Sequence, residues 1–118
     1  MILRDVMEIL SAEALYATDA NLGLEVKAVA ASDLMSDILA RARTPDLMLT
    51  GLATPQAIRT AAIASVKAVM VVRGKTLTPQ MIALAEESDI PLMVTRHSLF
   101  GAAGVVWSQG LRSGLELE

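Results

Sequence analysis

Three short, uniformly apolar segments recur along the chain, and the segments between them begin in nearly the same way. The apolar segments are Leu47–Thr50, Ala68–Val72 and Leu92–Thr95, and their lack of polar alternation is typical of strands buried on both faces of a parallel sheet. The sequence Thr-Pro-Gln follows the first two of them, at Thr54 and again 24 positions later at Thr78. Threonine followed by proline is a typical helix start, because proline loses no hydrogen bond at the first helical position. The repeat therefore predicts successive strand–helix units of a parallel sheet.

The rest of the chain predicts further elements of the same α/β class. Helices are expected over residues 4–11, 33–42, 55–65, 79–88 and 98–109, with Ser32 as the cap of the second, and strands over residues 13–17 and 25–31. The strand over residues 13–17 is expected at an edge of the sheet. Since 118 residues suffice for one hydrophobic core, we predict a single α/β domain over residues 1–114, with a mostly parallel central sheet in two or three layers. Residues 115–118 are a candidate expression-vector remnant.

The composition excludes several classes of site. The chain has no cysteine and one histidine, His97, which excludes disulfides, thiolate nucleophiles and multi-histidine metal sites. Its net charge of −3 does not favour nucleic acid, and no apolar run approaches the roughly 20 residues that span a bilayer. Residues 1–5 carry an acid, Asp5, where a secretory signal has a basic region followed by an unbroken apolar segment. We therefore expect a cytoplasmic domain without a metal or cofactor that binds neither nucleic acid nor a membrane.

The residues that follow the predicted strands most favour a binding site. Ligands of open parallel sheets bind beyond the carboxyl ends of the strands. This edge is expected to be electropositive, because residues 47–85 contain no acidic residue but several basic ones. Glycine lets a ligand approach the backbone, basic side chains attract an anion, and helix starts present free amides. The predicted anion or phosphate site consists of Gly51, Thr54, Arg73, Gly74, Lys75, Arg96 and His97. The same residues are also compatible with solvated loops and tight turns.

A second group of polar candidates lies in the predicted helix over residues 33–42. Asp33 and Asp37 are four positions apart, which places them on one helix face, and Ser36 lies beside Asp37. These side chains could serve as a polar ligand set, but acids in a first helical turn also stabilise the helix dipole without any function. No catalytic residue is predicted, because nothing near His97 in the sequence completes a triad, and phosphate-loop and kinase signatures are absent.

The order of these features resembles a known family. The segments that carry the resemblance are Ser36–Leu39, Pro45–Gly51, Ile90–Thr95 and Ser98–Phe100, and together they resemble the DRTGG domain over roughly residues 6–111. The resemblance implies a compact α/β unit, similar to the N-terminal domain of HPr kinase/phosphorylase. In that family the domain accompanies phosphotransacetylases and CBS-containing pyrophosphatases as a regulatory part. The chain departs from the motif of the family, because Leu52 and Ala53 follow Gly51 in place of an Asp-Arg pair.

We therefore predict a non-catalytic regulatory or ligand-sensing domain that binds a small phosphorylated metabolite or an adenine nucleotide. Two alternatives stay open: an enzyme of phosphoryl or acyl transfer that uses the same edge, and an assembly module without a ligand. The apolar segment Leu99–Trp107 contains no charged residue, so part of it is expected to lie in a homodimer interface. A partner protein is not identifiable from the sequence.

Overall fold

Six strands and six helices follow one another in the computed structural model, which describes residues 1–41, 43 and 45–115. The strands are β1 (Glu13–Tyr16), β2 (Ala28–Ala31), β3 (Leu47–Thr50), β4 (Ala68–Val71), β5 (Leu92–Val94) and β6 (Arg112–Ser113). The helices are α1 (Leu3–Ile9), α2 (Asp19–Leu22), α3 (Met35–Arg41), α4 (Pro55–Ile63), α5 (Pro79–Ser88) and α6 (Leu99–Ser108). Helices and strands alternate along most of the chain, as the repeat predicts.

All six strands form one sheet, in the order β1-β5-β4-β3-β2-β6. The strands β5, β4, β3, β2 and β6 run parallel to one another, whereas β1 lies at the edge of the sheet and pairs antiparallel with β5. Leu49, Met70 and Met93 stand side by side in the centre. The prediction of a mostly parallel sheet with three adjacent central strands is confirmed.

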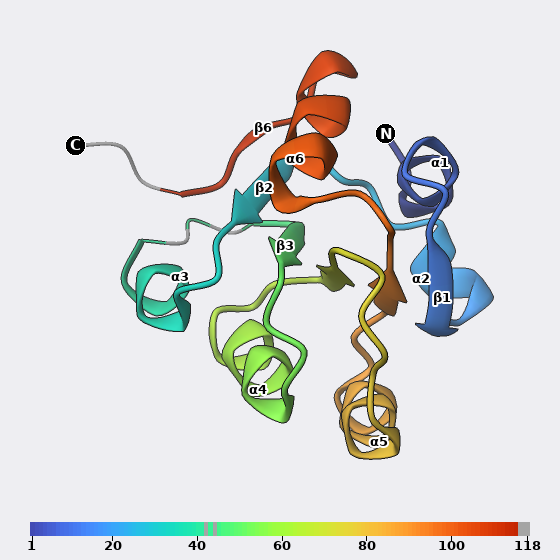
Figure 1. The fold of residues 1–118 in the computed structure, drawn as a ribbon, viewed down its shortest axis with the longest axis vertical. Coiled ribbons are helices and arrows are strands. Elements are labelled where there is room, and N and C mark those ends of the chain that lie inside the picture. Colours follow the sequence, from blue (N-terminus) through green and yellow to red (C-terminus); the bar gives the residue numbers. More distant parts are fainter. Residues whose placement is uncertain (42, 44, 116–118) are drawn as a thin grey trace.

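The sheet lies between two layers of helices, so the fold is the three-layer form of the predicted architecture (Figure 1). Because side chains alternate along a strand, β3 directs Met48 toward α3, α4 and α5, and Leu49 toward α1 and α6. The strand β4 divides in the same way, with Val69 on the first face and Met70 on the second. Both faces are buried, which explains why β3, β4 and β5 carry no charged residue and only Thr50 as a polar one.

Some boundaries differ from the sequence prediction. The strand expected over residues 25–31 is β2 and begins only at Ala28, and the helix expected from residue 33 begins at Met35. Ser32 accepts a hydrogen bond from the Leu34 backbone N–H at 3.0 Å, so it closes a turn before α3 and does not cap the helix itself. The end expected at residue 42 lies outside the described residues.

Two short elements were not predicted. The four-residue helix α2 is held by a capping box, in which Thr18 and Asn21 exchange side-chain and backbone hydrogen bonds. The strand β6 has two residues, and it forms because Ala28 and Val29 at the edge of β2 offer it pairing partners. Neither element is long enough to show a hydrophobic period.

Candidate functional site

The connections that leave β4 and β5 turn to opposite faces of the sheet. The chain leaves β3 and β4 toward α4 and α5 on one face, whereas it leaves β5 toward α6 on the other (Figure 1). The carboxyl ends of β4 and β5 therefore form a topological switch point, at which the connections of two neighbouring parallel strands turn to opposite faces. Such switch points are where open α/β sheets bind their ligands.

A cleft of about 580 Å³ opens at this switch point. One wall is residues 74–77, which follow β4, and a second is residues 94–97 at the end of β5. The third wall is formed by the turn between α1 and β1 together with the start of β1. Its lining residues are Leu10, Ser11, Glu13 and Leu15. Lys75, Arg96 and His97 bring basic groups to the cleft, while Glu13 is its acidic residue.

The loop after β4 is held by the backbone of the β5 end. The Arg73 N–H donates to the His97 carbonyl oxygen, and the Gly74 N–H donates to the Thr95 carbonyl oxygen, both at 2.8 Å. Arg73 and Gly74 adopt φ values of 68° and 60° in succession, a left-handed geometry that disfavours most side chains. A Cβ at Gly74 would lie 3.5 Å from Cγ of Arg96. The φ of 60° at Gly74 therefore favours glycine, whereas the space beside Arg96 would admit a Cβ.

The third wall is attached to the sheet by one buried side chain. Thr95 Oγ1 donates a hydrogen bond of 2.6 Å to the carbonyl oxygen of Leu10, and the His97 N–H lies 3.4 Å from the same Oγ1. Thr95 is 2% exposed. The α1–β1 turn and the end of β5 are therefore connected beneath the cleft.

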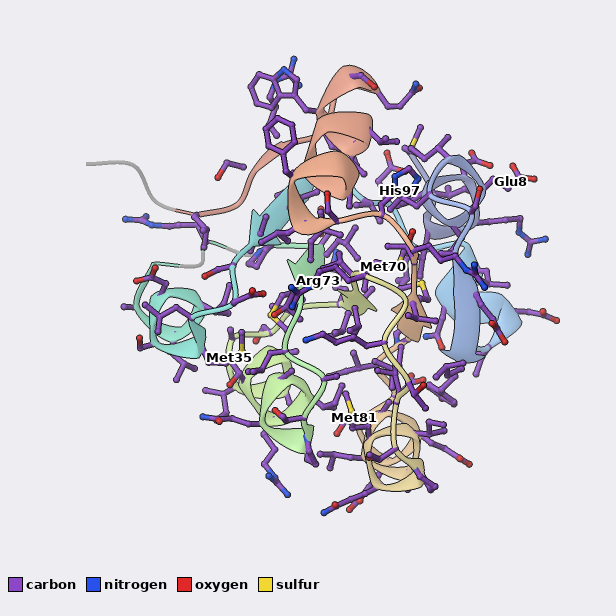
Figure 2. All side chains as sticks on the ribbon, viewed as in Figure 1. Glu8, Met35, Met70, Arg73, Met81 and His97 are labelled. Atoms are coloured by element: carbon purple, nitrogen blue, oxygen red, sulfur yellow. The ribbon has the colours of Figure 1, made fainter. Side chains whose placement is uncertain are left out.

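A second polar cluster lies at the end of β3, outside the lining of this cleft. Asp33 Oδ1 accepts a hydrogen bond from the Gly51 N–H at 2.5 Å and lies 3.3 Å from the Thr50 hydroxyl. A Cβ at Gly51 would lie 3.1 Å from both Asp33 Oδ1 and Arg73 Nη2, so Asp33 and Arg73 approach the same glycine. In Figure 2 Arg73 points along the strand ends toward β3, while His97 lies beside α1. The ammonium group of Lys75 donates to the Gly51 carbonyl oxygen and so connects the cluster to the cleft.

Six of the seven predicted ligand residues are consequently divided between two places. Gly74, Lys75, Arg96 and His97 line the cleft, whereas Gly51 and Arg73 belong to the cluster at the end of β3. The division has a structural cause, because the loops after β3 and β4 turn to the same face and pack on each other. Only the loop after β5 turns away.

The structure differs from two interpretations of the sequence: the helix cap at Thr54 and the shared helix face of Asp33 and Asp37. Thr54 stands at the N-cap of α4, but its Oγ1 is buried without a hydrogen-bond partner, and the Ala57 N–H bonds to the Thr54 backbone oxygen instead. Asp33 precedes α3 and does not share a helix face with Asp37, because its carboxylate is held by the end of β3. Ser36 is exposed on α3.

Sequence reasoning missed the wall of the cleft that residues 10–15 provide. The edge strand was expected over residues 13–17, but no local pattern shows that this strand pairs with β5 and brings Ser11 and Glu13 to the strand ends. The helix start at Ser98 was expected, and there the serine Oγ accepts the Gly101 N–H at 3.0 Å. This cap directs α6 away from the cleft immediately after His97.

In the described part of the chain, no group of three or more His, Asp or Glu side chains is arranged to hold a metal ion. None of its helices has both the length and the apolar character needed to cross a bilayer.

Comparison with known proteins adds a family and a fold. The model of the DRTGG domain family matches residues 5–107. No match was found among curated proteins. A solved structure of the CBS and DRTGG domains from the regulatory region of Clostridium perfringens pyrophosphatase, complexed with its activator diadenosine tetraphosphate, superposes with a TM-score of 0.76 at 22% identity. The match covers 93% of this chain and 47% of that one, so this chain spans about half the length of the solved regulatory-region chain.

Proposed function

The chain belongs to the DRTGG domain family, and from this premise we propose that it is a non-catalytic regulatory domain that binds a small phosphorylated metabolite. An adenine nucleotide is the first candidate. The observation that carries the proposal is the cleft at the switch point, which is lined by basic side chains from two loops together with apolar ones. The activator-bound regulatory region of the C. perfringens pyrophosphatase supports a regulatory, nucleotide-sensing role.

The cleft has the chemistry that a phosphate ester requires. Arg96 carries a planar guanidinium whose donors match phosphate oxygens, and its stem packs beside Gly74. Lys75 uses one donor on the Gly51 carbonyl oxygen and keeps two for a ligand. Leu10, Leu15, Leu77 and Val94 line the same cleft and offer apolar surface to the uncharged part of a ligand. Its volume of about 580 Å³ lies within the range of roughly 300–1,000 Å³ that small-molecule sites occupy.

We further propose that the domain acts in the cytoplasm as a homodimer, with part of the segment Leu99–Trp107 in the contact. This segment is apolar, and several of its side chains are exposed. Similarity to the N-terminal domain of HPr kinase/phosphorylase stays a prediction of the sequence resemblance.

Thermal unfolding with a panel of ligands tests the proposal. The panel contains AMP, ADP, ATP, diadenosine tetraphosphate, acetyl phosphate, a sugar phosphate and, as a control for charge alone, inorganic triphosphate. A ligand at about 100 times its dissociation constant stabilises the folded state by roughly 2.7 kcal/mol, which raises the melting temperature by several degrees in a domain of this size. We expect at least one organic phosphate to produce this rise in the wild type and triphosphate to produce less.

Two variants locate the site. Arg96→Ala removes a cation that lines the cleft, whereas Arg73→Ala removes a cation of the same type from the neighbouring loop outside the cleft lining. Loss of the rise in Arg96→Ala with its retention in Arg73→Ala supports the cleft. Equal loss in both variants supports one site that includes the end of β3.

No rise for any compound at millimolar concentration contradicts the ligand proposal and favours the assembly module. The enzyme alternative is examined with the same panel, by following phosphate release and acyl or phosphoryl transfer over hours. Turnover of a compound that binds would contradict the non-catalytic assignment.

A further inference from the structure

The outer face of α6 is an uninterrupted apolar stripe. Phe100 is 90% exposed and Trp107 is 59% exposed, although both are large apolar side chains. Between them lie Ala103 and Gly104, and a Cβ at Gly104 would meet no atom within 4 Å. Positions 100, 103, 104 and 107 share one helix face. The opposite face, which carries Ala102, packs into the core.

The stripe is symmetric about its own centre. Phe100 lies three positions before Ala103, and Trp107 lies three positions after Gly104. At about 1.5 Å per residue the two aromatic positions are roughly 10 Å apart along the helix axis. Two copies of α6 that cross antiparallel at the small residues would therefore place Phe100 of each copy next to Trp107 of the other. No side chain from Leu99 to Ser108 carries a charge, so the two helices themselves bring no like charges together.

An apolar groove of about 170 Å³ lies beside the stripe. Ala103, Val106 and Trp107 of α6 form one side, and residues of β2 and of the segment from Leu111 to Leu115 form the other. The guanidinium carbon of Arg112 lies 4.0 Å from the centre of the Trp107 ring and holds the indole as a wall of the groove. Apolar cavities of about 150 Å³ accommodate benzene, so the groove has room for a phenyl ring.

We propose that a second copy of the chain docks on α6 through a two-fold axis at Ala103 and Gly104, with Phe100 of each copy seated in the groove beside Trp107 of its partner. This arrangement is isologous, because each copy offers both the aromatic anchor and the groove that receives it. The small residues at the centre let the helix backbones come close. The inference rests on the proposed homodimer and gives it a geometry.

The area of the stripe is consistent with a dimer that dissociates on dilution. Stable interfaces bury about 800 Å² per partner, and aromatic side chains bury about 150–250 Å² each. Phe100 and Trp107 together therefore supply a substantial part of a standard interface but not all of it. A dissociation constant in the micromolar range is the expectation.

Analytical ultracentrifugation over a concentration series tests the interface. The wild type is expected to reach twice the chain mass at tens of micromolar. Phe100→Asp should weaken the dimer roughly tenfold to 100-fold, as removal of a buried aromatic anchor does. An acid in the first turn of α6 favours the helix, so this variant should stay folded. Ile63→Asp is the control, because Ile63 is 73% exposed on α4 in the other helix layer.

Disulfide trapping tests the geometry separately. Because the chain contains no cysteine, each introduced cysteine is the only thiol of its variant. Gly104→Cys should form a covalent dimer on oxidation, because the two sites face each other across the axis, and Ile63→Cys should not. Phe100→Cys mixed with Trp107→Cys should crosslink more than either variant alone.

The outcomes distinguish the homodimer itself from the proposed geometry of its interface. A wild type that stays monomeric overturns the homodimer together with this geometry. A dimer that persists in Phe100→Asp, or that crosslinks through Ile63→Cys and not through Gly104→Cys, overturns the geometry alone. Ligand stabilisation of Phe100→Asp reports on the cleft independently of both.

Discussion

Oδ1 of Asp46 lies 3.2 Å from Nζ of Lys67, and this contact ties the start of β3 to the start of β4. The other carboxylate oxygen of Asp46 accepts hydrogen bonds from the backbone N–H groups of Lys27 and Ala28, at 2.8 and 3.1 Å. One carboxylate thus holds three neighbouring strands at their amino ends, opposite the cleft. Burial raises the pKa of Asp46, but the two backbone donors and Lys67 outweigh it and lower the pKa below its usual value.

Asp46→Asn should remove a stabilisation that depends on pH. Because the pKa of Asp46 is lowered in the folded state, its contribution is present above the ordinary carboxyl pKa of about 3.9 and disappears as the pH falls through the lowered value. We expect the variant to lose about 1 kcal/mol at neutral pH, and the difference from the wild type to shrink in acid. Urea unfolding from pH 7 down to the acid limit of folding measures this. Glu87→Gln, on the exposed side of α5, is the control variant that removes a carboxylate from another part of the fold.

Thr95→Val should destabilise the domain through the carbonyl group of Leu10. Valine preserves the shape of threonine but cannot donate to this buried oxygen, which the Thr95 hydroxyl reaches at 2.6 Å. A buried acceptor left without its donor costs about 1–3 kcal/mol, which denaturant unfolding resolves. Thr95→Ser keeps the hydroxyl and should lose clearly less. Equal losses in the two variants would contradict this expectation, because they would give the methyl group as much weight as the hydrogen bond.

Gly74→Ala should cost more than Gly74→Asn, although asparagine is larger. The backbone at Gly74 has a φ of 60°, and asparagine tolerates this region better than alanine does. The expected loss for alanine is about 1 kcal/mol. Thermal and denaturant unfolding measure the stability of both variants. A smaller loss of stability for alanine than for asparagine would contradict the left-handed backbone at Gly74.

Gly114→Ala should weaken the pairing of β6 with β2. A Cβ at Gly114 would lie 2.9 Å from Cβ of Pro45, whose ring cannot move aside as a flexible side chain can. Overpacking of this kind costs about 1–3 kcal/mol. Gly23→Ala is the matched control, because the nearest atom to its Cβ would be 3.6 Å away. Faster amide hydrogen exchange at Val29 in Gly114→Ala, and not in Gly23→Ala, would place the damage at β6.

The central part of the fold is predictable because its signals are local. An apolar segment, a turn and a helix start at Thr78 are each visible within a few residues, and Thr78 does cap α5 by accepting the Met81 N–H at 3.2 Å. The same signal at Thr54 marks the start of α4 correctly, yet its hydroxyl forms no cap. Sequence therefore locates a helix start more reliably than it predicts the bonds made there.

The candidate site was only partly predictable for a different reason. Because the strands are parallel, their carboxyl ends were expected at one edge of the sheet. Lys75 and Arg96 do line the same cleft there. Whether a given loop opens into a cleft depends on the face to which its following helix turns. The packing of the helix layers on the sheet determines this face, and the sequence near Arg73 or His97 does not indicate it.

The antiparallel pairing of β1 with β5 has a consequence for the order in which the domain assembles. Glu13 and Val94 are register partners, although most of the chain lies between them. Closing a loop of this length costs conformational entropy before any contact compensates for it, and β5 offers an edge only after it has joined β4. The wall that contains Ser11 is therefore expected to form late in folding. A small molecule that contacts all three walls of the cleft would therefore bind the folded domain and would not bind its partly folded precursors.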